Sequence, residues 1–260
     1  MKEENGFKFE NKLGPVAFEG KEKRGKRMKY KNYIFDLYGT LVDIHTDEVD
    51  LKLWQKMVNV YKKHGVVYTP AKMRTIYQML VSEAQSEMDE ITIEPIFETM
   101  FLMKGVTVED ETVEEVCHLF RKKSTKHIRL YPWAVPMLEK LKKEGKKVVL
   151  LSNAQRVFTA PELQELDIEK YFDHIYISSD QGVKKPNPAF FNIMLTECGV
   201  EAADCLMVGN DETCDIGGAH KAGLDGFYIH TKISPEYTGE GKAEYEVLDA
   251  DEENGMIELP

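Results

Sequence analysis

Short apolar segments alternate with amphipathic, helix-like segments along most of this 260-residue chain, and this alternation constrains the fold more than any other feature. Turn residues bound the apolar segments, and the helix-like segments end at glycines such as Gly145, Gly199 and Gly223. The pattern predicts an α/β fold in which a doubly wound parallel sheet carries helices on both faces. We expect strands over 33–37, 147–151, 175–178, 205–209 and 226–229, and helices over 135–144, 188–198 and 215–222.

The alternation is interrupted between residues 43 and 130, where helix formers dominate. Amphipathic stretches over 51–64, 71–88 and 113–126 predict a helical insertion. An insertion directly after the first strand would stand over the end of that strand, where it could exclude water and select substrates. The alternative is a helical domain without a role in catalysis.

The two ends of the chain differ from the alternating part because they are charged and lack sustained periodicity. The first segment ends in a run of Lys and Arg, which indicates a solvated leader or an upstream extension before Met28; a basic arm for anionic surfaces is the alternative. Near the other end, residues 245–248 could form a last short strand. The predicted division is a flexible charged leader at 1–28, a core domain at 29–43 and 130–235, a helical cap domain at 44–129 and an acidic C-terminal tail at 236–260.

Charge and cysteine content exclude several classes of protein. The formal net charge is -11 and the pI is about 5.2, which argues against a general nucleic-acid-binding surface. The four cysteines show neither zinc-site spacing nor a dense disulfide framework, and no hydrophobic signal region opens the chain. No apolar stretch is long enough to cross a bilayer. We therefore expect a cytoplasmic protein with reduced thiols and no membrane partner.

Polar residues follow four of the expected strands, and the carboxyl ends of parallel strands meet at one edge of a sheet, where ligands bind. Each group has an ordinary explanation by itself: Asp caps turns and helices, Ser-Asn makes turns, and Lys-Lys faces solvent. Together they offer a carboxylate nucleophile, groups that hold an anionic oxygen, a neutralising ammonium and carboxylates suited to a hard cation. The groups are Asp36 with Thr40, Ser152 with Asn153, Lys184 with Lys185, and Asn210 with Asp211 and Asp215.

These residues lie in four longer motifs, namely DLYGTLVD at 36–43, the segment from LYP at 130–132 to LSN at 151–153, GVKKPNP at 182–188, and the segment from VG at 208–209 through DIGGA at 215–219 to AG at 222–223. In this order the motifs resemble the haloacid dehalogenase (HAD) superfamily of aspartate-nucleophile hydrolases, over about residues 29–229. The resemblance implies a Rossmann-like core with a helical cap inserted after the first motif, as in subfamily I, which agrees with the helical insertion.

The resemblance also implies a mechanism. Asp36 would attack phosphorus, or carbon in the dehalogenase branch, and water would then hydrolyse the covalent intermediate. Thr40, Ser152 and Asn153 would bind the oxygens of the transferring group, and Lys185, with Lys184 as the fallback, would balance their charge. A phosphorylated substrate would require Mg2+ to screen the repulsion between two anions. The implied metal ligands are Asp36, the backbone carbonyl of Tyr38, and Asn210, Asp211 and Asp215 of the fourth motif.

Tyr38 departs from the superfamily pattern, because most of its phosphatases have an Asp two residues after the nucleophile to protonate the leaving group. A phenol has an ordinary pKa of about 10 and is a poor proton shuttle near neutral pH. Tyr at this position is familiar in the dehalogenase branch, whose halide leaving group needs no proton. His45 is a weaker candidate for a substitute proton donor, and an incidental His in the linker is the alternative.

The fourth motif departs as well, because Asn210 stands where the family often has its first metal-binding Asp. Either Asp211 takes over as the first ligand or the affinity for metal falls. Asp211 and Asp215 nevertheless favour metal, which the dehalogenases do not need. We expect a Mg2+-dependent hydrolase, monomeric or homodimeric, that dephosphorylates a small phosphorylated metabolite. The alternatives are a metal-independent 2-haloacid dehalogenase and a low-activity protein that binds a phosphorylated metabolite.

Overall fold

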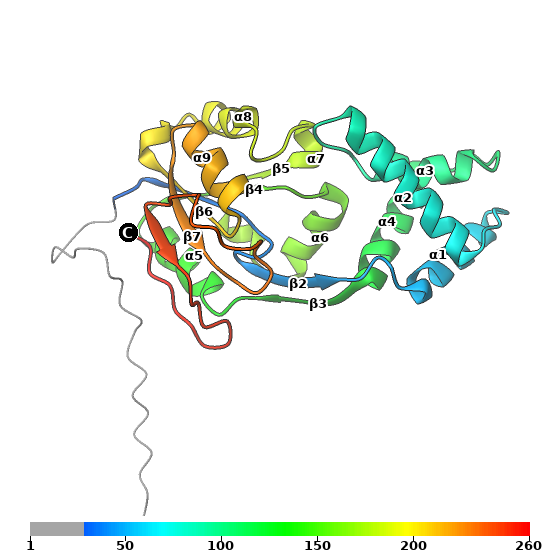
Figure 1. Ribbon diagram of the computed structural model, residues 1–260, viewed down its shortest axis with the longest axis horizontal. Helices are drawn as coiled ribbons and strands as arrows, with labels where there is room; N and C mark the ends of the chain where they lie inside the picture. The colour runs from blue at the N-terminus through cyan, green and yellow to red at the C-terminus, as the bar shows by residue number, and fades with distance from the viewer. Residues whose placement is uncertain (1–28) are drawn as a thin grey trace, which may run out of the picture.

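The computed structural model describes residues 29–260 and confirms the predicted α/β fold. Six parallel strands form a sheet flanked by helices, and four more helices lie to one side of it (Figure 1). Residues 1–28, where we expect the charged leader, lie outside the described part of the chain. The strands of this sheet, in the order β5-β4-β1-β6-β7-β8, are β5 His174–Ile177, β4 Lys147–Ser152, β1 Asn32–Phe35, β6 Cys205–Gly209, β7 Asp225–Ile229 and β8 Tyr245–Val247.

The strand order reverses at β1, which has β4 on one side and β6 on the other. Phe35, the last residue of β1, is in register with Leu150 of β4 and with Val208 of β6. After β4 the chain extends the sheet through β5, whereas after β6 it extends the sheet in the opposite direction through β7. The carboxyl end of β1 therefore lies at the topological switch point, where open α/β sheets bind their ligands.

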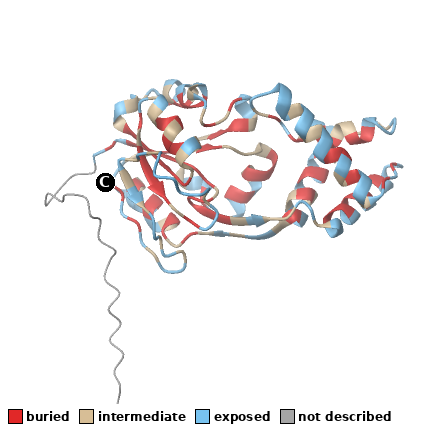
Figure 2. Cartoon of the chain, in the orientation of Figure 1, coloured by how far each residue is buried: buried red, intermediate tan, exposed pale blue. Residues whose placement is uncertain are grey.

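The two faces of the sheet have separate hydrophobic cores, because successive side chains of a strand point to opposite faces. Tyr33 and Phe35 belong to one core together with residues of α5, whereas Ile34 belongs to the other together with residues of α8 and α9. The strands and the inner sides of these helices are the buried parts of this region (Figure 2). The helices of the core are α5 Ala134–Lys143, α6 Arg156–Glu165, α7 Ser178–Gln181, α8 Pro188–Cys198 and α9 Gly218–Lys221, with short helical turns at η1 Glu169–Tyr171, η2 Ala202–Asp204 and η3 Glu212–Gly217.

Four helices between residues 51 and 102 and between 110 and 124 form the helical insertion. They pack around their own hydrophobic core, in which Trp54, Phe97 and Phe120 are fully buried. Val157 and Phe158 of α6 join this core, so α6 is the part of the main domain on which the insertion rests. The helices are α1 Leu51–Lys63, α2 Pro70–Glu87, α3 Glu94–Leu102 and α4 Asp110–Ser124.

A two-stranded antiparallel ribbon connects the insertion to the sheet at one side of the molecule (Figure 1). Its strands are β2 Val42–Thr46 and β3 Thr125–Leu130, neither of which is expected from the sequence. A second connection lies on the other side, at the loop between α2 and α3. The side chain of Gln155 accepts from Ile93 N at 2.8 Å and donates to Ile91 O at 2.8 Å. The insertion is thus held at two separated points.

The C-terminal segment, where the sequence predicts an acidic tail at 236–260, contains the short strand expected at 245–248 as β8. Its residues pack on the core: β8 extends the sheet beside β7, and Ile257 and Leu259 are each 8% exposed. The hydroxyl of Tyr33 donates to the backbone carbonyl of Pro260 at 2.7 Å. The segment is rich in acidic side chains. Burial of its apolar side chains against α5 is nevertheless favourable, because it removes apolar surface from water.

Two properties of the described residues bear on the class of protein. Within residues 29–260, no helix combines the length and the apolar character that a membrane span requires. All four cysteines carry free thiols; Cys117, Cys198 and Cys205 are buried and Cys214 is half-buried. The free thiols agree with the reduced cysteines that the sequence predicts.

Candidate active site

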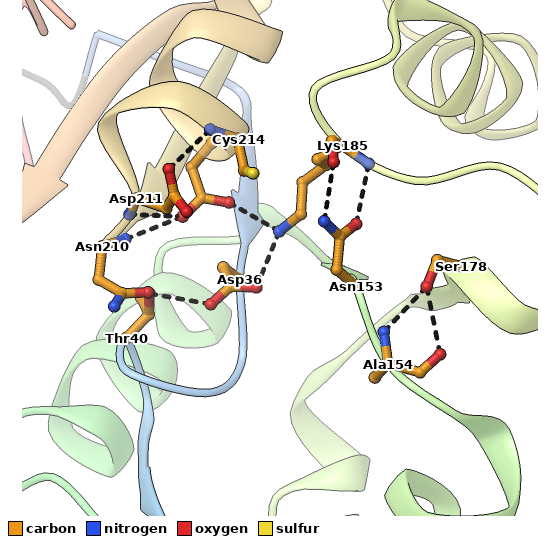
Figure 3. A network of polar contacts seen from close by, with 10 residues as sticks. Asp36, Thr40, Asn153, Ala154, Ser178, Lys185, Asn210, Asp211 and Cys214 are labelled. Carbon is orange, nitrogen blue, oxygen red and sulfur yellow. Dashed lines mark hydrogen bonds and ion pairs between the residues drawn. The ribbon is translucent and has the colours of Figure 1, made fainter. Parts of the chain in front are cut away.

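Asp36 is the first residue after β1 and therefore lies at the switch point of the sheet. Its backbone N–H donates to Val208 O at 3.0 Å, which continues the pairing of β1 with β6. The residue is only 8% exposed, so its carboxylate needs partners within the protein. The side chains that surround it come from the ends of β1, β4 and β6 and from the loop before α8 (Figure 3).

Lys185 lies between two carboxylates. Its Nζ is 2.8 Å from Asp36 Oδ1 and 2.7 Å from Asp215 Oδ1, and its side chain is 1% exposed. Burial alone would lower the pKa of Lys185, but Asp215 and Asp36 raise it above its ordinary value. Burial raises the pKa of Asp215 to about 6, against the opposing effect of Lys185. We call Asp36, Lys185 and Asp215 the core cluster.

Asn153 positions Lys185 through its backbone. The Asn153 amide donates from Nδ2 to Lys185 O at 2.9 Å and accepts at Oδ1 from Lys185 N at 2.8 Å. These two bonds hold the loop before α8 against the end of β4. Asn153 therefore holds the backbone of Lys185 in place, and one N–H of its amide stays outside these two bonds.

Thr40 and Asn210 lie on the other side of Asp36. Thr40 Oγ1 is 3.3 Å from Asp36 Oδ2 and 3.3 Å from Asn210 Oδ1. A hydroxyl has one proton to donate, so it can satisfy only one of these two oxygens at a time. Gly39 makes the approach of Asn210 possible, because a Cβ at Gly39 would lie 2.2 Å from Asn210 Nδ2. Asp36 Oδ2, Thr40 Oγ1 and Asn210 Oδ1 therefore lie close together, and the Thr40 hydroxyl supplies the one proton that they share.

The two aspartates of the fourth motif point to other partners. Asp215 Oδ2 accepts from the backbone N–H groups of Asn210, at 2.9 Å, and Asp211, at 3.0 Å, while its Oδ1 meets Lys185. Asp211 is the N-cap of η3, where its carboxylate accepts from Thr213 N and Cys214 N, each at 2.8 Å. Asn210, and not Asp211, is therefore the residue of this motif that lies next to Asp36.

Ser152 ends β4, which is the neighbour of β1. Within residues 29–260 its buried hydroxyl has no hydrogen-bond partner. Most buried polar groups are satisfied, so an orphaned hydroxyl at the switch point suits a ligand that brings its own acceptor. The role of Ser152 in binding a substrate oxygen stays a prediction.

Tyr38 is turned away from Asp36 toward α6. Its hydroxyl donates to Glu162 Oε2 at 2.5 Å and lies 3.1 Å from Thr159 Oγ1. Arg121 of α4 pairs with the same carboxylate, with its Nε 2.6 Å from Glu162 Oε1, and its guanidinium lies over the Tyr38 ring at 5.4 Å. Burial raises the pKa of Tyr38, and the charge of Glu162 acts in the same direction. We call Tyr38, Glu162 and Arg121 the junction cluster, since it joins the core to the insertion.

Sequence reasoning missed the partners of Tyr38. Arg121 reads as one of several basic residues in the last turn of a helix, and Glu162 lies in a helix that contains Pro161 and was not predicted. No local pattern connects positions 38, 121 and 162. His45 lies on β2, where its ring stacks on that of His127 of β3 with 5.9 Å between the ring centroids. Its ring contact is therefore within the ribbon. Lys185 rather than Lys184 makes the ion pairs with the carboxylates.

The oxygens beside Asp36 fit a hard divalent cation only in part. Among residues 29–260, no three His, Cys, Asp or Glu side chains converge so as to hold a metal ion. Mg2+ also binds through amide and carbonyl oxygens and keeps several waters, so one carboxylate is sufficient when other oxygens stand beside it. The Asp36 carboxylate and Asn210 Oδ1 offer such oxygens on either side of the Thr40 hydroxyl, whereas Asp211 and Asp215 bind backbone N–H groups and Lys185.

Comparisons with known proteins agree with this geometry. A family model described as haloacid dehalogenase-like hydrolase matches residues 30–223, which is more than half of the chain. N-acylneuraminate-9-phosphatase of Homo sapiens is 31% identical over 121 residues, 46% of this chain and 48% of that protein. Glyceraldehyde 3-phosphate phosphatase of Pyrococcus furiosus is 25% identical over 198 residues, 75% of this chain and 79% of that protein. Apart from that match, the chain spans about half the length of the curated relatives it matches, or less.

Solved structures show the same fold. The HAD phosphatase from Thermococcus onnurineus has a TM-score of 0.55 and 23% identity, and covers 84% of this chain and 93% of its own. The 2-haloacid dehalogenase from Pseudomonas syringae pv. Tomato DC3000 has a TM-score of 0.59 and 21% identity, and covers 85% of this chain and 94% of its own. A phosphatase and a dehalogenase thus share this architecture, and the fold does not distinguish their reactions.

Proposed function

This chain belongs to the haloacid dehalogenase-like hydrolases, and on that premise we propose that it hydrolyses small phosphorylated metabolites through a covalent intermediate on Asp36. One observation carries the assignment of the nucleophile. Lys185 holds Asp36 Oδ1 at 2.8 Å, whereas among residues 29–260 the partner of Asp36 Oδ2 is the Thr40 hydroxyl at 3.3 Å. One oxygen is thus fixed and the other is available for attack.

The proposed reaction has two steps. In the first, Asp36 Oδ2 forms a bond to phosphorus while the bond from phosphorus to the leaving oxygen breaks, and its electron pair stays on that oxygen. In the second, water attacks phosphorus, Asp36 leaves as a carboxylate and inorganic phosphate is released. Lys185 and the unpartnered hydroxyl of Ser152 would bind oxygens of the phosphoryl group, and Asn153 holds Lys185 in place.

Mg2+ is part of the proposal. Asp36, Asn210 and the backbone carbonyl of Tyr38 would hold it, and it would supply screening between the carboxylate and the phosphate. Asp215 would act by another route, since its carboxylate holds Lys185 and the loop of Asn210. Asp211 would act as a helix cap. The ligand set therefore contains a single carboxylate, which predicts weaker metal binding than a pair of carboxylates gives.

A metal-independent 2-haloacid dehalogenase is the second candidate, because Tyr38 supports it. The Tyr38 hydroxyl is bonded to Glu162 and Thr159, and a halide leaves without a proton. The relatives named as phosphatases favour phosphate for this chain. Location in the cytoplasm and a monomeric or homodimeric state stay predictions, as does the division into a core, a helical cap and the two terminal segments.

The test compares the two reactions with the same protein. The full chain is assayed for release of inorganic phosphate from a panel of phosphate esters with Mg2+, and for release of chloride from 2-chloropropionate with chelator. We expect phosphate release that requires Mg2+ and disappears in Asp36→Asn. Chloride release in chelator, without phosphate release, would establish the dehalogenase instead, and inactivity with tight binding of a phosphorylated metabolite would establish a binding protein.

A further inference from the structure

We infer that the substrate is a phosphate whose leaving group departs as a stable anion, namely an acyl phosphate or an aryl phosphate, rather than a simple alkyl phosphate. The inference rests on the proposed function and narrows its substrate class. It follows from where the structure places the side chains that could deliver a proton to a leaving oxygen beside Asp36.

Tyr38 occupies the position two residues after the nucleophile, but its hydroxyl is not directed to the reacting centre. It donates to Glu162 Oε2 and lies 3.1 Å from Thr159 Oγ1, on the side of α6. A phenol is a weak acid near neutral pH, and the proton of this one is used in the bond to Glu162. Tyr38 therefore does not supply the proton that an alkoxide leaving group needs.

Glu162 cannot replace it. Both of its carboxylate oxygens are bonded to Arg121, with Nε 2.6 Å from Oε1 and one terminal guanidinium nitrogen 3.2 Å from Oε2. Oε2 also accepts from the Tyr38 hydroxyl, so both oxygens of Glu162 are engaged by Arg121 and Tyr38 and neither is directed to the reacting centre. Its side chain is 11% exposed, so water does not compete for this pairing.

The remaining groups around Asp36 are not placed to deliver a proton either. Lys185 is fixed between two carboxylates, and its ammonium is directed to Asp36 and Asp215. Asp215 meets Lys185 at Oδ1 and two backbone N–H groups at Oδ2, so both of its oxygens are directed to these partners and not to a leaving oxygen beside Asp36. Thr40 and Ser152 are hydroxyls, whose proton is not released near neutral pH. Within residues 29–260 the site thus binds phosphate oxygens but lacks a proton donor.

The effect of a missing proton donor on the rate depends on the leaving group. An alkoxide has a conjugate acid with a pKa on the order of 16, like water, and its departure without a proton is strongly opposed. A carboxylate from an acyl phosphate has a conjugate acid with a pKa of about 4, and a phenolate one of about 10 or below. These groups take the electron pair of the broken bond to phosphorus and acquire a proton from solvent later. The second step meets the same requirement, because its leaving group is the carboxylate of Asp36.

A leaving-group series tests the inference with the full chain and Mg2+. The value of kcat/KM is measured for acetyl phosphate, for aryl phosphates whose phenols differ in pKa, and for alkyl phosphates such as glycerol 3-phosphate. We expect kcat/KM to fall steeply as the leaving-group pKa rises, and alkyl phosphates to lie about 10²–10⁴-fold below reactive aryl phosphates, the usual contribution of a general acid. A flat series with efficient alkyl phosphate turnover would overturn this inference and leave the proposed function standing. Absence of turnover across the whole series would overturn the proposed function itself.

Two substitutions at one position sharpen the test. Tyr38→Asp introduces a carboxyl group beside Asp36, and we expect it to raise kcat/KM for alkyl phosphates relative to aryl phosphates and to flatten the series. Tyr38→Phe removes only the hydroxyl; kcat/KM can fall for every substrate alike, but we expect its dependence on leaving-group pKa to keep the same slope. A steeper slope in Tyr38→Phe would show that Tyr38 donates the proton after all. If Tyr38→Asp does not fold, the leaving-group series measured with the wild-type protein still tests the inference.

Discussion

The core cluster and the junction cluster flank the same short loop after β1, yet they differ in what holds them together. In the core cluster, Lys185 lies between two carboxylates whose other partners also belong to the core, namely the Thr40 hydroxyl for Asp36 and two backbone N–H groups for Asp215. In the junction cluster, Glu162 belongs to α6 of the core and Arg121 to α4 of the insertion. The charges of the first cluster cannot separate without unfolding the site, whereas those of the second separate whenever the insertion moves.

The loop after β1 therefore carries two residues, Asp36 and Tyr38, whose surroundings come from different parts of the molecule. Asp36 keeps its electrostatic surroundings whatever the insertion does, because every partner of its carboxylate comes from the core. Tyr38, two residues later, has its ring under the guanidinium of Arg121 and is therefore sensitive to the insertion. The contacts of the nucleophile thus come from the core, whereas those of Tyr38 include a side chain of the insertion.

The most severe way to break the core cluster is to remove the nucleophile. Asp36→Asn keeps the shape of the side chain but removes its charge, and we expect turnover of any accepted phosphate to fall by at least about 10⁴-fold. Steady-state phosphate release measures the loss, and thermal unfolding checks that the fold is retained. Substantial activity in a folded Asp36→Asn protein would refute the covalent mechanism.

Removing the shared cation should damage both activity and stability. Lys185→Met leaves two buried carboxylates without their ion pair, and we expect the free energy of unfolding to fall by about 3–5 kcal/mol. Lys184→Met is the matched control, since Lys184 is half-buried and outside these ion pairs; we expect a change within about 0.5 kcal/mol. Denaturant unfolding monitors both variants.

The pH dependence of stability in Lys185→Met tests the role of Asp215 in the core cluster. Burial already raises the pKa of Asp215 to about 6, and loss of Lys185 should raise it further. A carboxyl group with a higher pKa in the folded state than in the unfolded state binds protons preferentially in the folded state. Its contribution to stability therefore falls as pH rises from about 4 through the folded-state pKa. We expect a larger loss of stability at pH 8 than at pH 5, and an equal loss at both would show that Asp215 does not carry the effect.

Breaking the junction cluster should cost less and leave the chemistry in place. In a double-mutant cycle of Arg121→Met and Glu162→Gln, we expect a coupling free energy of about 1–3 kcal/mol. The loss of kcat/KM in either variant should be smaller than in Lys185→Met, because neither side chain touches Asp36. Arg129→Met is the control, since Arg129 is 62% exposed in its pair with Asp43 and exposed pairs contribute at most about 1 kcal/mol. A coupling near zero would mean that the two parts are not joined through this ion pair.

The smallest expected effect is at the second connection to the insertion. Gln155→Ala removes two hydrogen bonds to the loop between α2 and α3, and we expect a loss of about 1–2 kcal/mol together with faster proteolysis of residues 88–93. Gln164→Ala, on an exposed part of α6, serves as the control. Equal proteolysis of the two variants would show that Gln155 does not hold this loop.

Most of the sheet could be predicted because its strands are continuous apolar segments with turn residues at both ends. The segment 205–209 and the helix 188–198 coincide with β6 and α8. The ribbon strands β2 and β3 were missed because each is short and half exposed, with charged or His side chains between its apolar ones. Pro161 weakens the pattern of α6, and the nine residues of α3 are too few to show a period.

The sequence by itself determined which residues reach the switch point, because strand ends of a parallel sheet must converge there. Asp36, Lys185 and Asp215 do so from three segments far apart in the chain. Only the tertiary structure decided the direction of each side chain. Asp211 caps the N-terminus of η3, and the preceding residue, Asn210, lies beside Asp36 and Thr40. Tyr38 contacts Arg121 of α4 and Glu162 of α6. Local patterns fix where the chain passes, whereas the orientation of a side chain depends on neighbours that only folding brings together.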